Sequence, residues 1–183
     1  MTVSGESGVA LLLTMMAMLL LSVLAAAMVL STSTESAIAA SFRNDREAFY
    51  AAEAVGEWAL AELATRKDDW TAIVNGMEVS SFTDGPPAGT RIVSGQPVAD
   101  LTSIRAANTG WQLFAWGAFA DLVRSPSASQ FYIVALVASD TSSLDGLLVR
   151  ALALGPRGAF KTVELQIRRS ARGVHVISWK EGP

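Results

Sequence analysis

The sequence predicts an α+β fold, in which one long N-terminal helix packs on a C-terminal antiparallel β-sheet. Three observations predict it. Residues 9–30 form an apolar run without charge, glycine or proline, an amphipathic helical pattern continues to about residue 67, and strand-like patterns separated by turn residues fill residues 111–183. Because the helix comes first and the strands follow as a block, we expect an α+β rather than an alternating α/β domain.

The apolar run is long enough to cross a membrane. It reads VALLLTMMAMLLLSVLAAAMVL, and about 20 residues at roughly 1.5 Å each span a hydrocarbon core about 30 Å thick. We therefore expect one transmembrane helix over residues 9–30. A cleaved secretory signal is the alternative, with a cut near residues 25–27, but the residues before the run contain no Lys or Arg.

The helix is expected to continue beyond the membrane. No glycine lies between Gly8 and Gly56, and the first proline is Pro86, so the two strong helix breakers are missing. A polar collar at residues 31–36 follows the apolar run, and an amphipathic helical pattern continues from it. The collar and this pattern form the second half of the helix, residues 31–67. Its apolar residues recur at spacings of three, four or seven, which places them on one helix face. The residues expected on the sheet-facing side are Ile38, Phe42, Phe49, Ala52, Val55, Ala59 and Leu63.

The rest of the chain predicts a loop-rich connection followed by a sheet. The connection is expected over residues 68–110, of which residues 76–110 are rich in Gly, Ser, Thr and Pro, with at most a short strand near residues 91–93. Four or five antiparallel strands are expected in residues 111–183, with a hairpin turn at residues 155–158. The expected strands are 111–120, 130–139, 147–154, 159–168 and 173–179.

The last strand alternates clearly enough to predict its two faces. Val174 and Val176, followed by Ser178, are expected on one face. His175, Ile177 and Trp179 are then expected on the other.

Composition excludes several kinds of chemistry. The chain of 183 residues has a net charge of −3, which argues against a nucleic-acid-binding protein, and no cysteine, which excludes disulfides, zinc–thiolate sites and thiol catalysis. The one histidine, His175, is expected to be a packed or rim residue of its strand. Asp140 and Asp145 lie in one turn without the calcium-binding EF-hand pattern. We therefore expect no catalytic residues, no metal and no cofactor.

The C-terminal region is basic, and two interpretations stay open. These side chains either balance acidic residues of the helix or of another subunit, or they form a patch that binds phosphate or DNA. The salt dependence of binding would separate the two. The residues are Arg150, Arg157, Lys161, Arg168, Arg169, Arg172 and Lys180.

Four motifs stand out in the N-terminal half: GVALL at residues 8–12, the collar STSTES at 31–36, ASFR at 40–43 and AFYAAEA at 48–54. In this combination the N-terminal half resembles type IV pilin-like proteins, and more narrowly the PilX-type minor pilins. The C-terminal stretch ALALGPRGAFKTVELQIRR resembles the end of such proteins more loosely. The resemblance therefore covers residues 1–65 well and the tail in part.

This resemblance implies that the chain is a prepilin with a leader at residues 1–8. A prepilin peptidase would cut between Gly8 and Val9 and methylate the new amine of Val9; a glycine at the cut lets the protease approach the backbone closely. The mature helix would sit in the bacterial inner membrane with the C-terminal domain outside the cytoplasm. It would then enter a filament, where residues 9–30 pack against the same region of other major and minor pilins.

Two positions depart from the family pattern. Many pilins carry Glu at the fifth residue after the cut, where it pairs with the N-terminal amine of an adjacent subunit, but here that residue is Leu13. A carboxylate in lipid is costly unless paired, so Leu13 removes both this cost and the docking signal. That favours a minor subunit that lies near the tip or starts assembly. In addition, Glu6 and Ser7 precede the cut, where family leaders usually have a basic residue.

Three classes of function remain. The first is an assembly subunit of a type IV pilus or of a type II secretion pseudopilus; the chain leaves little room for the large helical insertion of tip pseudopilins, which favours a PilX-like minor pilin. The second is a signal-anchored periplasmic binding module that never polymerises. The third is an enzyme, for which the sequence offers no catalytic constellation. A mature protein that starts at methylated Val9 supports the first class, and one that keeps Met1 supports the second.

Overall fold

The computed structural model describes residues 6–124 and 130–182, with side chains from Gly8 onward. The chain divides into two compact units, Met1–Arg43 and Asn44–Pro183, which are described separately. The first five residues of the predicted leader lie outside the described part. Helix α1, Glu6–Thr65, accounts for the described residues of the first unit and opens the second. The prediction of one unbroken helix to about residue 67 is confirmed.

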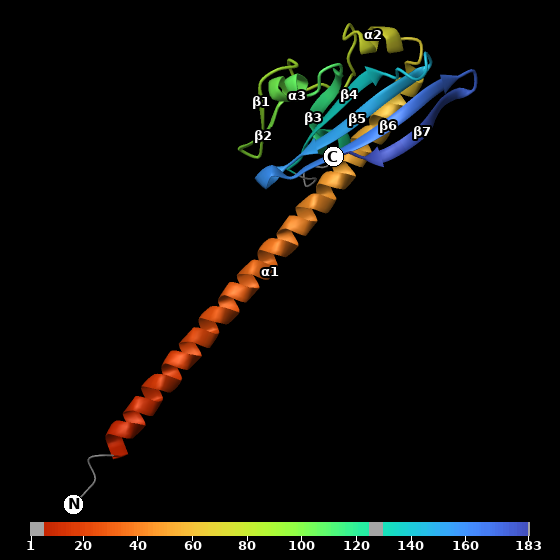
Figure 1. Ribbon diagram of the computed structural model, residues 1–183. Helices are drawn as coiled ribbons and strands as arrows, with labels where there is room; N and C mark the ends of the chain where they lie inside the picture. Colours follow the sequence, from red (N-terminus) through yellow and green to blue (C-terminus); the bar gives the residue numbers. More distant parts are fainter. Residues whose placement is uncertain (1–5, 125–129, 183) are drawn as a thin grey trace, which may run out of the picture. The chain divides into compact units, whose positions relative to one another are not determined.

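The C-terminal unit contains the predicted antiparallel sheet. Its five strands follow each other in chain order, each hydrogen-bonded to the next (Figure 1). Such an order needs only hairpin-like connections, which agrees with the turn residues between the strands. The predicted hairpin turn is a short 3₁₀ segment at Pro156–Gly158 between β5 and β6. The strands are β3 Gln112–Ala118, β4 Tyr132–Ser139, β5 Gly146–Leu154, β6 Phe160–Ser170 and β7 Gly173–Glu181.

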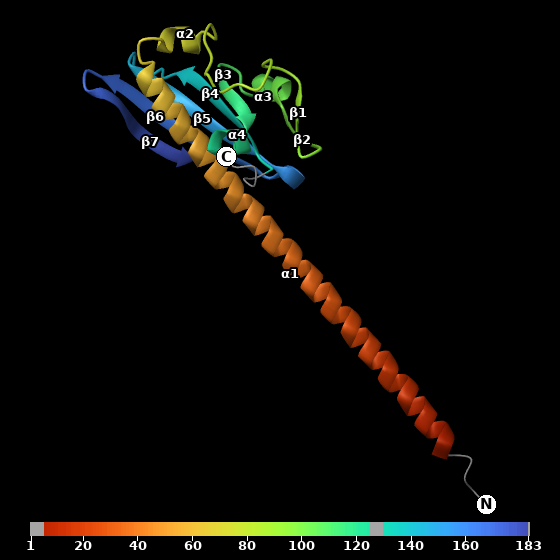
Figure 2. The ribbon, with the colours of Figure 1, turned by 180° about the vertical axis from the view of Figure 1, so that it is seen from behind.

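Helix α1 lies along one face of the sheet (Figure 2). Small residues line the contact. A Cβ atom added to Gly56 would lie 3.0 Å from Leu165 of β6 and 3.5 Å from Ala151 of β5. Ala135 and Ala153 are fully buried in the same cluster. The buried helix residues of this cluster are Ala48, Ala51, Ala52, Val55, Ala59 and Leu63.

The predicted sheet-facing stripe is confirmed in its C-terminal part only. Ala52, Val55 and Leu63 are buried, and Phe49 is partly buried against the same cluster. Ile38 and Phe42 belong to the N-terminal unit and are 54% and 67% exposed, so the structure gives them no place in the buried stripe. Helical periodicity continues past the point where a packing surface is available, because it reflects the sequence and not the extent of the sheet.

The segment predicted to be a loop-rich connection is more structured than expected. Residues 68–110 contain helix α2, Trp70–Val74, the hairpin of β1, Thr90–Val93, with β2, Gln96–Asp100, and helix α3, Leu101–Ala107. These elements are short, so their stability comes from tertiary contacts and caps more than from intrinsic propensity. For example, the side chain of Asp100 accepts a hydrogen bond from the backbone of Thr102 at the start of α3.

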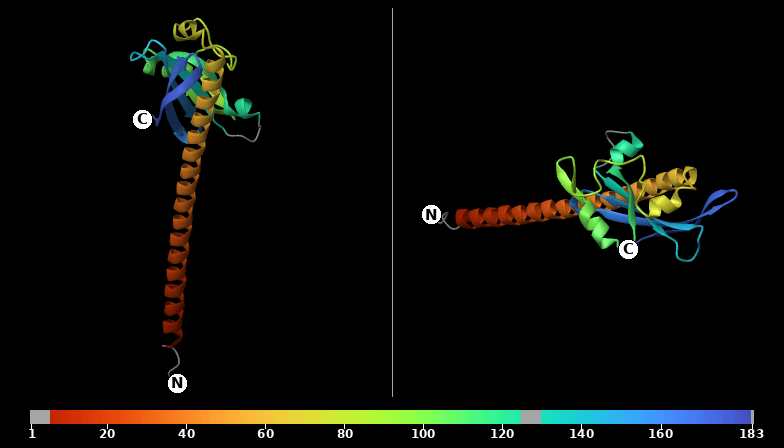
Figure 3. Two further views of the ribbon diagram at one scale, coloured as in Figure 1. Left: turned by 90° about the vertical axis from the view of Figure 1, so that its right-hand side faces the viewer. Right: turned by 90° about the horizontal axis from the view of Figure 1, so that it is seen from above.

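Helices and short segments cover part of each face of the sheet (Figure 3). One face carries α1 together with α2 and helix α4, Phe119–Val123. On the other face, a second cluster packs residues of β2 and α3 against β3, β4 and β5. Its largest fully buried side chain is Tyr132, whose hydroxyl accepts a hydrogen bond from Nε of Arg91 at 3.1 Å. Burial raises the pKa of Tyr132 to about 12, although Arg91 acts in the opposite direction.

The predicted faces of β7 are wrong beyond Val176. Val176 pairs with Ile167, but Ser178 pairs with Gln166, so Ile177 is an extra residue in the ladder. Such a β-bulge shifts the alternation by one residue. As a result, Trp179 lies on the helix side of the sheet, where its ring centroid is 6.0 Å from that of Phe49.

Enlarging Gly56 is expected to destabilise the C-terminal unit. Gly56→Leu places a side chain where even a Cβ is tight against Leu165, and overpacking of this kind costs about 1–3 kcal/mol. The measurement is urea unfolding of the full chain in detergent, followed by tryptophan fluorescence.

The matched control is Ala61→Leu, which adds the same side chain to an exposed position of the same helix. It should change the unfolding free energy by less than about 0.5 kcal/mol. Equal effects of the two substitutions would contradict close packing at Gly56.

Candidate functional site

The N-terminal unit offers a continuous apolar helix surface. Helix α1 is long and apolar enough to span a membrane, by length and composition, and none of its most apolar window is buried. The apolar side chains from Val9 to Leu30 are exposed. An apolar surface of this size needs lipid or other apolar helices around it.

The hydroxyl groups in this stretch are satisfied by the helix itself. The hydroxyl of Thr14 donates to the carbonyl of Leu11, and that of Ser22 donates to the carbonyl of Met18, both at 2.8 Å. Thr32 and Thr34 in the collar donate in the same way to carbonyls four residues earlier. The apolar part of the helix therefore presents no unsatisfied hydroxyl to a hydrocarbon environment.

The predicted processing residues lie in the first turns of α1. A side chain added to Gly8 would meet nothing within 4 Å. Val9 and Leu13 are exposed and, being four residues apart, lie on the same helix face. No contact of the fold thus fixes the identity of these three residues.

A groove lies on the helix face of the sheet in the C-terminal unit. It has a volume of about 300 Å³. Its floor and apolar wall come from β6 and β7, and its other wall comes from α1. We call this the β7 groove, and it is lined by Glu53, Glu57, Leu60, Leu165, Val176 and Trp179.

The β7 groove combines apolar surface with acidic groups. Val176 and Trp179 are 44% and 46% exposed, which is high for apolar residues on the packed face of a sheet. Glu53 and Glu57 are one turn apart on α1, and within residues 6–124 and 130–182 no ion pair is seen for either. The β-bulge at Ile177, which brings Trp179 to the same side of the sheet as these carboxylates, is not visible in the alternation of the sequence.

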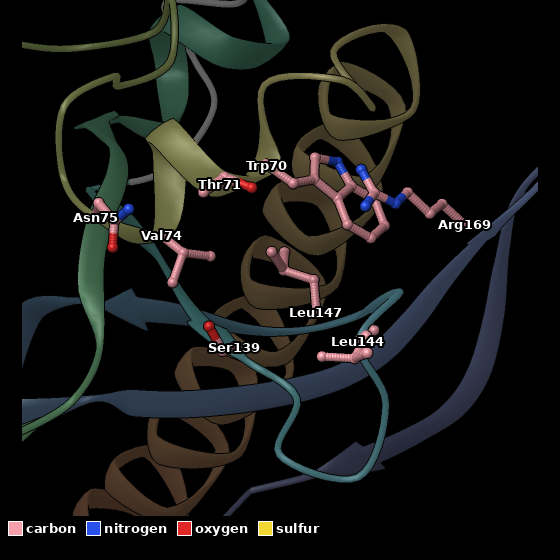
Figure 4. Close-up of a pocket in the computed structure, with 9 residues that line it drawn as sticks. Trp70, Thr71, Val74, Asn75, Ser139, Leu144, Leu147 and Arg169 are labelled. Atoms are coloured by element: carbon pink, nitrogen blue, oxygen red, sulfur yellow. The ribbon is translucent and has the colours of Figure 1, made fainter.

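A smaller cavity of about 120 Å³ lies where α2 meets the end of the sheet (Figure 4). The guanidinium of Arg169 lies over the ring of Trp70, 5.8 Å from its centroid. The same guanidinium donates to Asp145 and to the backbone carbonyl of Lys67, both at 3.0 Å. Because Nε and Nη1 of Arg169 already bond within the fold and its charge is paired with Asp145, we interpret this cavity as a packing contact between α2 and the end of the sheet.

Most of the basic C-terminal residues are paired with nearby acids. Lys161 bridges Asp45 of α1 at 3.2 Å and Glu181 of β7 at 3.0 Å. The other paired residues are Arg150 and Lys180, both with Glu164, and Arg169 with Asp145. Charge balance within the fold therefore accounts for four of the seven basic residues, one of them across the helix–sheet boundary.

Glu164 of β6 forms ion pairs with two cations, Arg150 of β5 and Lys180 of β7. Burial raises the pKa of the Glu164 carboxyl, but hydrogen bonds from Lys180 and Arg150 outweigh this and place the pKa below its ordinary value. Arg150 in turn stacks over Trp111, with 4.2 Å between the guanidinium and the ring centroid. The network ties β5, β6 and β7 together.

His175 and Asp140, the other residues with potential catalytic or metal-binding groups, have polar neighbours within the fold. Nε2 of His175 is 3.0 Å from the hydroxyl of Ser170 at the exposed β6–β7 hairpin. The carboxylate of Asp140 accepts hydrogen bonds from Ser142 and Gln166. Across the described ranges, no group of three or more His, Cys, Asp or Glu residues is placed to hold a metal ion.

Comparisons with protein-family models, with curated proteins and with solved structures find no match for this chain. Functional interpretation therefore depends on the residues and their geometry.

The lowered pKa of Glu164 makes stability dependent on pH. Since the folded carboxyl has a lower pKa than the unfolded one, its stabilising contribution is fully present above the unfolded value of 4.5 and is lost as the pH falls through the folded value. Urea unfolding from about pH 6 down to about pH 3 should therefore show a smaller loss of stability for Glu164→Gln than for the wild type.

Glu57→Gln is the control, since it removes a carboxylate for which no ion pair is seen in the described chain. Its unfolding free energy at neutral pH should stay within about 0.5 kcal/mol of the wild-type value. If Glu164→Gln keeps the wild-type pH dependence, the network of Arg150, Glu164 and Lys180 does not contribute to folding.

Proposed function

We propose that this chain is a minor pilin of the PilX type, which takes part in type IV pilus assembly after prepilin-peptidase cleavage. The observation that carries the proposal is the single helix α1, Glu6–Thr65. Its first part is apolar and exposed, and its last part is buried against an antiparallel sheet through small residues. A helix of this kind is suited to two apolar environments in turn, the lipid bilayer and then the core of a helical filament.

The resemblance of residues 8–12 and 31–54 to PilX-type minor pilins supports the same proposal. The partners are the prepilin peptidase and other major and minor pilins. The helix is anchored in the bacterial inner membrane, and the C-terminal domain is extracytoplasmic before the protein enters the pilus. Nucleic acid is not a proposed partner.

The absence of a carboxylate at Leu13 supports a place at the tip or in priming. A shaft subunit with Glu at this position gains a pairing partner in the filament, whereas Leu13 gains only apolar contacts. A subunit without this attraction is less suited to repeated addition along the shaft than to starting or capping assembly.

Two other functions remain testable. A minor pseudopilin of a type II secretion system would share the cleavage and the filament-like assembly, and would be recovered with secretion pseudopili instead of pili. A signal-anchored periplasmic binding module would keep its N-terminus or be cut elsewhere. N-terminal sequencing distinguishes the last case from the first two.

Cleavage between Gly8 and Val9 is the first test. Gly8→Val should abolish processing by a co-expressed prepilin peptidase, because a branched side chain at this position obstructs the approach of the protease to the backbone. N-terminal sequencing and mass spectrometry of the membrane fraction should show methylated Val9 in the wild type and the uncut chain in the variant.

Gly5→Val is the matched control, since it places the same side chain in the same leader away from the cut. Processing should be retained. A Cβ atom added at Gly8 meets nothing within 4 Å in the structure, so Gly8→Val is expected to leave the fold intact. An uncut wild-type chain in the presence of the peptidase would refute the proposal.

The second test introduces the missing carboxylate. Leu13→Glu is expected to raise the number of copies in sheared filaments and to spread them along the shaft, because the new carboxylate can pair with the N-terminal amine of a neighbouring subunit. Quantitative mass spectrometry and immunogold labelling of sheared filaments measure copy number and position.

Leu13→Gln is the control, because it adds polarity without a charge. It should not increase incorporation. If Leu13→Glu leaves both copy number and position unchanged, Leu13 does not set the place of the subunit in the filament.

A further inference from the structure

The two edges of the five-stranded sheet differ. Strand β7 forms one edge, and within the described chain no backbone hydrogen bond to its free side is seen. At the other edge, the extended segment at residues 80–84 adds to β3. Its backbone bonds to Phe114 and Trp116 at 2.8–3.2 Å, and Thr83 forms a bridge with Trp116. One edge is therefore closed by an extended segment, and the other is open.

The closed edge shows how such a segment also fills the space beside α1. The ring centroid of Phe82 lies 5.4 Å from that of Trp58 on α1. A Cβ atom added to Gly117 of β3 would lie 2.6 Å from the Phe82 ring. Phe82 therefore covers the helix face of the sheet while the backbone of its segment closes the edge. On the β7 side of α1, the corresponding space is the β7 groove.

A segment added to β7 would lie closer to α1 than residues 80–84 do. Gly56 approaches both β5 and β6, so α1 lies over the boundary between these strands. Counted outward from that boundary, residues 80–84 take the fourth strand position, after β5, β4 and β3. A segment paired with β7 would take the third position, about 4.8 Å beyond β7. Its side chains on the helix face can therefore reach the β7 groove.

The lining of the β7 groove defines the side chains that such a segment needs. Val176 and Trp179 are partly exposed, so apolar side chains that cover them gain buried area. Glu53 and Glu57 lie about 6 Å apart along α1, so one Lys or Arg side chain between them can reach both carboxylates. In the parts of the chain that the structure describes, neither carboxylate has an ion pair. A cation beside an exposed indole such as that of Trp179 gains further attraction.

Strand β7 of a second copy does not carry these side chains. Residues directly opposite each other in the ladder with β6 share a face, and this identifies the residues of β7 on the helix face. They are Val174, Val176, Trp179 and Glu181. A second β7 paired edge to edge would thus bring a carboxylate and no cation to an acidic groove. Charge complementarity therefore favours a different protein as the occupant.

We propose that β7 accepts an extended segment of a different protein by β-strand addition, and that this segment carries Lys or Arg between two apolar residues on its helix-face side. Backbone hydrogen bonds to the edge supply affinity, and the β7 groove selects the side chains. The basic side chain pairs with Glu53 and Glu57, and its apolar neighbours cover Val176 and Trp179. The inference goes beyond the proposed pilin function, because it concerns the C-terminal unit alone and applies equally to a chain that never polymerises.

A peptide of defined chemistry tests the proposal. The probe is the heptapeptide Thr-Val-Thr-Arg-Thr-Val-Thr with blocked ends, whose Val and Arg side chains share one face when it is extended. It is titrated into the full chain in neutral detergent micelles, with empty micelles as the blank. NMR shifts give the Kd, and amide hydrogen exchange reports backbone pairing. Exchange in β7, Gly173–Glu181, should slow with occupancy, whereas exchange in β3, Gln112–Ala118, should not change.

Two altered peptides separate backbone pairing from side-chain contact. N-methyl groups on the internal amides remove the hydrogen-bond donors but keep every side chain, and should weaken binding by about tenfold or more. Replacing the Arg of the peptide by Glu should weaken binding by a similar factor, because like charges then meet in the groove. If either altered peptide binds as tightly as the parent, strand addition beside an acidic groove is refuted.

Charge reversal in the protein tests the position of the basic side chain. Glu53→Lys with Glu57→Lys should reverse the preference from the Arg peptide to the Glu peptide. Asp68→Lys with Asp121→Lys is the matched control, since it changes the net charge equally at exposed positions that do not line the groove. This control should keep the preference for the Arg peptide. Equal effects of the two double substitutions would contradict a site at the β7 groove.

The outcomes also distinguish this inference from the proposed function and from self-association. If the Arg peptide does not bind, or binds without slowing exchange in β7, the inference is refuted, while cleavage before Val9 still tests the proposed function by itself. If exchange in β7 slows as the chain becomes more concentrated without peptide, a second copy is the occupant and the different protein is wrong.

Discussion

The close approach of α1 to the sheet is the constraint on which the C-terminal unit depends. A helix can lie this near a sheet only if both surfaces carry small side chains at the crossing. At the crossing, helix α1 contributes Gly56 and four alanines, and the sheet contributes Ala135, Ala151 and Ala153. These residues contribute little apolar area each, but they allow larger neighbours such as Leu63, Leu165 and Ile167 to close the core around the crossing.

The position of this crossing also decides what stays exposed. Because α1 lies over β5 and β6, the two sides of the helix face need separate cover. The β3 side receives it from α2, α4 and the segment at residues 80–84, whereas Val176 and Trp179 remain exposed on the β7 side. The acidic face of α1 borders this uncovered strip through Glu53 and Glu57. An open groove with apolar walls and carboxylates follows from the geometry of a single helix on a five-stranded sheet.

The N-terminal unit depends on a different constraint. The apolar side chains of residues 9–30 are exposed in the structure, and an exposed apolar helix of this length requires an apolar environment. Unsatisfied hydroxyl groups and charges are costly in such an environment. Here the hydroxyl groups bond to the helix backbone, and no residue from Val9 to Leu30 is charged. In the proposed pilin, Leu13 makes the helix more apolar than the helix of a shaft subunit that carries Glu at this position. It thereby weakens the specific docking to the N-terminal amine of a neighbouring subunit.

The sequence by itself determined the elements that depend on local pattern. Missing breakers and helical periodicity predicted α1. Alternating apolar residues with turn residues between them predicted four or five antiparallel strands, and the structure has a five-stranded sheet there. The roles of Gly8, Val9 and Leu13 are predictions from a resemblance in the sequence, and the structure adds only that Val9 and Leu13 are exposed. Periodicity and composition are local properties, so they carry over directly into secondary structure.

Only the tertiary structure decided which residues become buried and which surfaces meet. It starts the buried stripe at Ala48 instead of Ile38, because burial needs a sheet opposite the helix. It turns Trp179 to the helix side through the bulge at Ile177, which local alternation does not reveal. It also forms β1, β2 and α3 in a segment that was predicted to be mostly loop. Two local features mark these elements: the turn at Ser94 and Gly95, both with positive φ, and the helix cap at Asp100. The β7 groove exists only because residues more than a hundred positions apart are brought together, and no local pattern contains that information.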